Sequence, residues 1–70
     1  MNWDKSMKVG DLVKVTRSAV RGDYEEGIVL EIKKDTTYEN VERYYVKYYS
    51  FKKGREETQW ANHVEVVSRA

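Results

Sequence analysis

Residues 10–32 read GDLVKVTRSAVRGDYEEGIVLEI, and this stretch decides the fold. Two runs of β-branched and apolar residues, 12–15 and 28–32, are separated by a polar segment that contains Gly22. Such runs favour strands, and a glycine in the polar segment between them favours a turn. The stretch therefore predicts one long β-hairpin, against which every later strand must pack.

Residue alternation along the hairpin predicts which side chains are buried. In the first strand, residues 12–17, Val13 and Val15 share the face that we expect in the core. In the second strand, residues 27–33, we expect Ile28, Leu30 and Ile32 in the core, with Val29 and Glu31 opposite. The intervening loop is expected to span residues 18–26, with Gly22 at a positive φ.

Three more strands are predicted, over residues 43–51, 56–60 and 64–67. Residues 34–42 read as a loop, residues 52–55 as a tight turn with Gly54 in a left-handed conformation, and residues 61–63 as one helical turn. The fold class is therefore all-β, a five-stranded antiparallel barrel with one short helical turn before the last strand. The predicted core comprises Val13, Val15, Ile28, Leu30, Ile32, Val46, Val64 and Val66, with Tyr44 and Tyr48 on the same face as Val46.

The length of 70 residues allows one domain with a modest core. We expect residues 1–8 to be a flexible leader and residues 9–68 to form a single domain. Trp3 could fold back on the barrel, contact a partner or be incidental, and we favour fold-back. The chain has no cysteine, so packing must stabilise it without disulfides. It has no apolar run of signal-peptide or membrane-span length, which predicts a cytoplasmic protein without membrane contact.

The charges are nearly balanced, with 13 Lys and Arg against 12 Asp and Glu, so nucleic-acid binding would need a local basic patch. Alternating strand directions place the first and third loops at one end of a barrel. That end would gather the nucleic-acid-binding candidates Arg17, Arg21, Lys52, Lys53 and Arg55. Nearby acidic residues could instead cancel their field, which the near-neutral total charge favours: Asp23, Glu25, Glu26, Glu56 and Glu57.

The sequence contains few of the residues that enzymes use for catalysis. His63 is the one histidine, there is no cysteine, and no serine lies in a nucleophile-elbow setting. The carboxylates lack the ligand spacing of zinc or calcium sites. We therefore expect no enzyme activity, no cofactor and no metal.

The aromatic content, six Tyr, two Trp and one Phe, exceeds what so small a core can enclose. Exposed rings could hold an extended peptide or stack on bases. Ordinary cross-strand packing, worth about 0.2–1 kcal/mol per pair, is the alternative. The partner-binding candidates are Tyr24, Tyr45, Tyr49, Tyr38 and Phe51.

The segments GDLVKV, GIVLEI, YYVKYY, TQW and HVEVVS, in this order, resemble the Src-homology-3-like barrels, which include Tudor and KOW modules. The resemblance covers nearly the whole of residues 9–68, and more narrowly it points to short proteins of this fold encoded by tailed phages, cyanophages among them. In that group a Trp typically ends the fourth strand, which implies that Trp60 is in the core or half-buried at the barrel mouth. Ser18 stands where the KOW pattern has a loop glycine, and the loop before Gly27 is longer here. Residues that match the KOW pattern are Gly10, Asp11, Val13, Val15, Arg21, Gly22, Gly27, Val29 and Ile32.

These observations lead to three functional expectations. The first is a non-enzymatic module that binds a protein segment through residues 17–26, residues 36–42 and exposed tyrosines. The second, which the KOW resemblance implies, is a nucleic-acid-binding module that uses the basic loop end. The third is a structural or assembly component, for example of a phage particle, built by edge-strand pairing. The protein would be a monomer or small homo-oligomer, in the host cytoplasm or the virion if phage-encoded.

Overall fold

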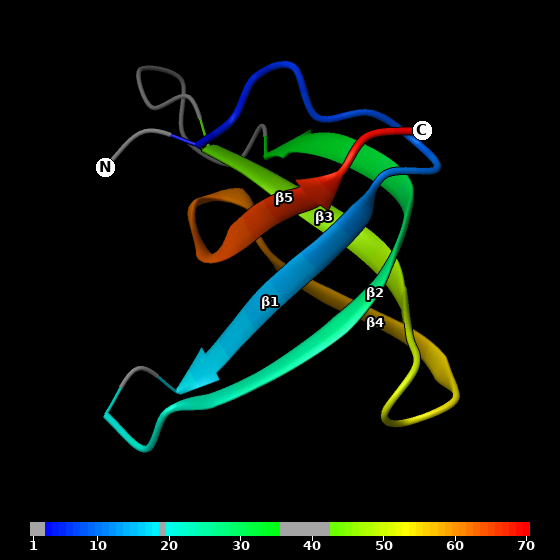
Figure 1. Ribbon diagram of the computed structural model, residues 1–70. Coiled ribbons are helices and arrows are strands. Elements are labelled where there is room, and N and C mark those ends of the chain that lie inside the picture. The colour runs from blue at the N-terminus through cyan, green and yellow to red at the C-terminus, as the bar shows by residue number, and fades with distance from the viewer. Residues whose placement is uncertain (1–2, 19, 36–42) are drawn as a thin grey trace.

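A computed structural model describes residues 3–18, 20–35 and 43–70 of the chain (Figure 1). The elements are β1 (Leu12–Ser18), β2 (Asp23–Asp35), β3 (Arg43–Ser50), β4 (Arg55–Trp60), the 3-10 turn η1 (Ala61–His63) and β5 (Val64–Ser68). This confirms the predicted all-β class, the five strands and the single helical turn before the last strand. No helix in these residues is long and apolar enough to cross a membrane.

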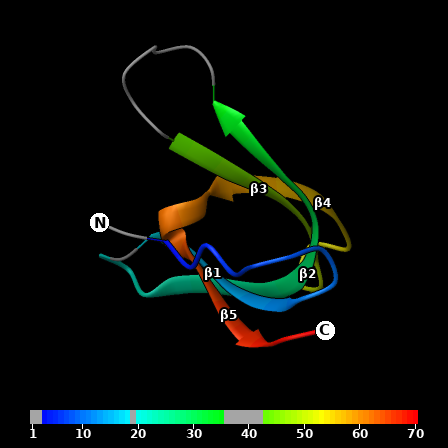
Figure 2. The same ribbon diagram turned by 90° about the horizontal axis from the view of Figure 1, so that it is seen from above.

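The strands form one antiparallel sheet in the order β4-β3-β2-β1-β5. β2 curves between two layers, pairing with β1 through its first half and with β3 through its second half (Figure 2). Within the described residues, no backbone ladder joins β4 to β1 or β5, so the sheet is not closed. Side chains span part of this gap: the Gln59 amide donates to the Thr16 carbonyl at 2.9 Å, and Arg17 donates to the Thr58 carbonyl at 3.1 Å.

The core lies between the two layers. It confirms the predicted burial of Val13, Val15, Val46 and Val64, and Tyr48 beside them is fully buried. Predicted core residues that are only partly buried, but pack against this cluster, are Ile32, Tyr44 and Val66.

The predicted core face of β2 is wrong over its central part. Val29 is fully buried, whereas Leu30 exposes 38% of its surface and Ile28 is only partly buried. A β-bulge explains the difference, because Val29 pairs with Tyr48 and Glu31 with Lys47, so Leu30 is the extra residue. The bulge reverses the alternation, and Ile32 beyond it returns to the core side opposite Val46.

Between residues 3 and 11, before β1, some side chains pack on the core, while the expected leader of residues 1–8 stays a prediction. Met7 is buried in the core, and Trp3 folds back on the core as expected, with its ring 4.9 Å from that of Tyr44. The carboxylate of Asp11 accepts hydrogen bonds from the backbone N–H groups of Lys8 and Ala70. These bonds lower the pKa of Asp11 and tie the two chain ends together.

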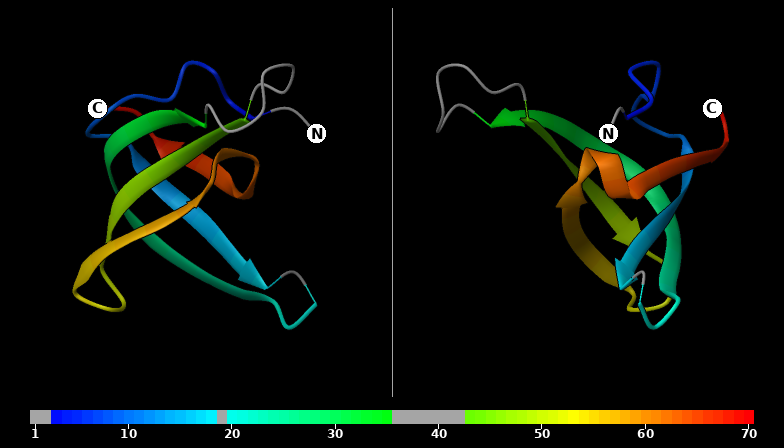
Figure 3. Two further views of the ribbon diagram at one scale, coloured as in Figure 1. Left: turned by 180° about the vertical axis from the view of Figure 1, so that it is seen from behind. Right: turned by 90° about the vertical axis from the view of Figure 1, so that its left-hand side faces the viewer.

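The first turn is shorter than the predicted loop of residues 18–26. β2 already begins at Asp23, which pairs with Ser18, so most of that segment is strand. Gly22 and Gly54 both have the expected positive φ, of 68° and 65°. The β1–β2 and β3–β4 turns lie at the same end of the molecule, as predicted from the strand directions (Figure 3).

We expect Val29→Ala to destabilise the protein more than Leu30→Ala. Removing the fully buried Val29 side chain loses apolar burial and leaves a cavity, at a cost of roughly 2 kcal/mol. Leu30 lies at the bulge and is partly exposed, so its truncation should cost less than about 1 kcal/mol. Urea unfolding of both variants tests this order. A larger loss for Leu30→Ala would contradict the bulge.

We expect Gly54→Val to lower the Tm clearly, because a β-branched side chain is strained at φ 65°. Gly54→Asn is the matched control, since asparagine tolerates the left-handed region. It should lower the Tm much less. Thermal unfolding followed by circular dichroism measures both, and equal Tm values for the two variants would contradict the left-handed conformation.

Candidate functional site

The basic residues predicted from the sequence gather at the turn end of the sheet. A pocket of about 330 Å³ at this end is lined by four of the five candidates together with Asp23, Tyr24 and Glu25. We call it the basic pocket. The four are Arg17, Arg21, Lys52 and Lys53. The fifth, Arg55, lies outside the lining and pairs with Glu57 at 3.4 Å.

A buried carboxylate lies beneath this pocket. The Glu25 side chain is only 2% exposed, and it accepts a hydrogen bond from the Tyr48 hydroxyl. Arg17 Nε lies 3.4 Å from Glu25, and Lys53 Nζ lies 3.9 Å from it. The same two cations reach Glu57, at 3.2 Å from Arg17 and 2.9 Å from Lys53.

This network shifts the acidities of its members. Burial acts to raise the pKa of Glu25, but the Tyr48 hydroxyl, Lys53 and Arg17 outweigh it, so the pKa is lowered. Burial and the hydrogen bond to Glu25 raise the pKa of Tyr48. The hydrogen bond from Lys53 lowers the pKa of Glu57. Both carboxylates are therefore ionised at neutral pH.

The expected charge cancellation is largely present at this end. Glu25 and Glu57 form ion pairs with Arg17, Lys53 and Arg55, two negative charges against three positive ones, while Asp23 pairs with Arg21 at 3.2 Å. Glu56 does not contribute, because it pairs with Lys47 at 2.8 Å.

The aromatic candidates divide between two places. Tyr24, Tyr49 and Phe51 expose 54%, 40% and 53% of their surfaces on the outer face of β2 and β3. The Tyr49 and Phe51 rings meet nearly edge-on, with centroids 6.2 Å apart. Tyr45 is half-buried and lies edge-on to Trp60, with centroids 6.1 Å apart. Tyr38 and the expected binding loop 36–42 lie outside the described residues.

An apolar row crosses this outer face. In the strand register, Leu12 pairs with Ile28, and Ile28 pairs with Tyr49. Side chains of directly paired residues are neighbours on one face of a sheet. The backbone N–H of Phe51 donates to the Glu26 carbonyl, which places Phe51 beside this row. We call the surface formed by Leu12, Ile28, Leu30, Tyr49 and Phe51 the outer apolar face.

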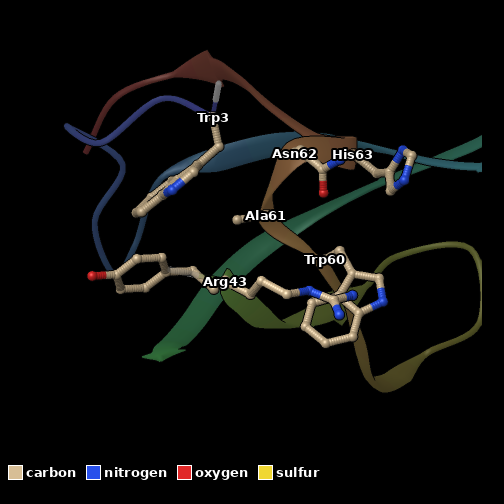
Figure 4. Close-up of a pocket in the computed structure, with 7 residues that line it drawn as sticks. Trp3, Arg43, Trp60, Ala61, Asn62 and His63 are labelled. Atoms are coloured by element: carbon tan, nitrogen blue, oxygen red, sulfur yellow. The ribbon is translucent and has the colours of Figure 1, made fainter. Parts of the chain in front are cut away.

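A second pocket, of about 260 Å³, lies at the opposite end of the β3–β4 hairpin, and sequence reasoning missed it. Trp3 lies on one side and Arg43 with Trp60 on the other, with Ala61 between them and the Asn62 amide pointing into the space (Figure 4). The Arg43 guanidinium stacks 4.1 Å from the centre of the Trp60 ring. Tyr44 and His63 complete the lining. We call it the aromatic pocket.

Trp60 is exposed, with 36% of its surface accessible, so the expectation of a core or half-buried position is wrong. Its partners in the aromatic pocket come from three separate segments of the chain. The one signal in the sequence that could have indicated the pocket is Trp3, which was expected to fold back on the barrel.

No cluster of His, Asp or Glu that could hold a metal ion occurs in the part of the chain that the structure describes. Comparison with protein-family models, curated proteins and solved structures found no match to this chain. The site must therefore be interpreted from its own chemistry.

We expect Glu25→Gln to lower the free energy of unfolding at pH 7 by roughly 1–3 kcal/mol, because it leaves Arg17 without its buried partner. The folded-state pKa values of Glu25, Glu57 and Asp11 are lowered, so their contribution is present above pH of about 4.5 and is lost as the pH falls further. Urea unfolding at pH 7, 4 and 3 measures this. The loss on acidification should be smaller in Glu25→Gln than in the wild type.

The matched control is Glu56→Gln, since Glu56 forms an exposed ion pair with Lys47. Such pairs contribute little to stability. If Glu56→Gln destabilised the protein as much as Glu25→Gln, the buried network would not have the importance that its geometry indicates.

Proposed function

We propose that this chain is a non-enzymatic binding module that recognises an extended segment of a partner protein through the outer apolar face. The observation that supports this most directly is the unbroken row Leu12, Ile28 and Tyr49, with Phe51 beside it. An apolar patch that remains exposed on a folded domain is typical of an interaction surface.

The chemistry of this face suits an extended peptide. Tyr49 and Phe51 are large rings that lose little side-chain entropy on binding, and aromatic residues are enriched among interface hot spots. Charged side chains border the row, with Lys14 and Glu26 paired across β1 and β2 and Lys47 and Glu56 paired by an ion pair. An apolar centre with a polar rim is the usual anatomy of a protein interface.

We also propose that the curved sheet is an SH3-like barrel. Two observations support this: β2 takes part in both layers, and the Arg17 and Gln59 side chains bridge β1 to β4. The further proposal that the module is a small accessory protein of a tailed phage depends on the sequence resemblance alone.

Nucleic-acid binding at the basic pocket is a second candidate. The observation that favours it is the gathering of Arg17, Arg21, Lys52 and Lys53 around Tyr24. Its weakness is that Arg17 and Lys53 already pair with Glu25 and Glu57. Attraction for phosphate at this end therefore depends mainly on Arg21 and Lys52.

The test is selection of binding peptides from a displayed random library, followed by amide-shift titration of the labelled protein. Selected peptides should shift residues of β2 and β3 around Ile28, Tyr49 and Phe51. Phe51→Ser should weaken binding at least tenfold, as for a hot-spot residue. Affinity should change little between low and high salt, in contrast to phosphate contacts.

Val20→Ser is the matched control, because Val20 is almost fully exposed in the first turn, away from the outer apolar face. It should leave the affinity unchanged. Shifts confined to Arg21, Lys52 and Lys53, together with a steep loss of affinity in salt, would replace this proposal by the second candidate.

A further inference from the structure

The open side of the sheet, between β1 and β4, has a third pocket that adjoins the other two. Thr16, Arg17, Gln59, Trp60 and His63 line it, with a volume of about 210 Å³. It shares Trp60 and His63 with the aromatic pocket and Arg17 with the basic pocket. The three pockets therefore follow one another along the open side of the sheet, and we call this row of pockets the seam.

The two ends of the seam differ in their chemistry. Trp60, at the end of β4, lines the aromatic pocket, and Lys52 and Lys53, in the turn before β4, line the basic pocket. A strand of six residues spans about 17 Å. One end of the seam is thus aromatic and the other basic, separated by about the length of β4. A ligand that fits this arrangement must offer a flat group at one end and negative charge along its length.

The aromatic pocket has the chemistry of a nucleobase site. The tilted Trp3 and Tyr44 rings and the Arg43 guanidinium offer flat faces on which a base can stack. The Asn62 amide points into the same space and carries both a donor and an acceptor for a base edge (Figure 4). No acidic residue is among the seven that line the pocket, which favours an anionic ligand over a cationic one.

We propose that the seam binds single-stranded nucleic acid, with one unpaired base in the aromatic pocket and the phosphates running past Arg17 toward Arg21 and Lys52. This inference rests on the second candidate function and extends it, because it specifies a single-stranded ligand and adds a base-binding anchor outside the basic pocket. A duplex does not fit, since its bases are stacked inside and cannot enter a pocket. The aromatic end gives the seam an anchor that the partly neutralised basic pocket lacks.

The experiment uses intrinsic fluorescence. Trp3 and Trp60 are the only two tryptophans of the chain, and both line the aromatic pocket. Titration with an eight-nucleotide oligothymidine should therefore quench the emission, and the affinity should fall as salt is raised. Loss of one stacked base typically weakens binding about 5- to 150-fold, so Arg43→Gln should fall in this range while keeping both tryptophans.

Lys8→Gln is the matched control, because it removes the same charge from an exposed residue that lines none of the three pockets. It should weaken binding by less than about twofold. Arg43→Gln must retain the wild-type Tm for the comparison, and Asn62→Ala provides a second variant of the pocket that should also weaken binding.

Three results would overturn the proposal. The first is no quenching by the oligonucleotide. The second is equal affinity for a duplex of the same length, which would indicate phosphate contact without a base in the pocket. The third is quenching by a selected peptide but not by the oligonucleotide, which would assign the aromatic pocket to a protein ligand.

Discussion

The buried carboxylate of Glu25 holds together the side of the sheet that has no backbone ladder. Glu25 lies on β2, accepts a hydrogen bond from the Tyr48 hydroxyl of β3 and forms an ion pair with Arg17 of β1. Arg17 continues to Glu57 and the Thr58 carbonyl on β4. An ionised group can be buried only if it is paired and hydrogen-bonded, and no buried polar side-chain atom in the described residues lacks a hydrogen bond. One buried, hydrogen-bonded carboxylate thus links side chains from four strands.

This structural use of charge limits what the turn end can bind. Arg17 and Lys53 would have to leave Glu25 and Glu57 in order to engage a ligand fully, and Glu25 would then be buried without its cations. The cost is much smaller for Arg21, whose pair with Asp23 is exposed. An anionic ligand at this end would therefore contact only a minority of its basic residues, and strong binding would need a second anchor elsewhere on the surface.

Sequence reasoning succeeded where alternation is unbroken and failed where it is interrupted. Val13, Val15, Val46 and Tyr48 follow simple period-two patterns, and their faces were predicted correctly. In β2 the residues that face the core are Glu25, Gly27 and Val29. Because the first is charged and the second is a glycine, the sequence shows no apolar alternation on this face. The aromatic pocket was missed for a different reason. Trp3, Arg43 and Trp60 are far apart in the chain, and only the tertiary fold brings them together.

Gly27 and the bulge at Leu30 together explain why the outer apolar face exists. A Cβ at Gly27 would lie 2.2 Å from the Tyr49 carbonyl oxygen, so this position admits only glycine and fixes the close packing of β2 on β3. With Gly27 turned inward, Val29 must also face the core, and Ile28 must face outward beside Tyr49. The bulge then lets Ile32 return to the core. The inward-facing Gly27 and the β-bulge therefore leave Ile28 and Leu30 on the outer face of the sheet.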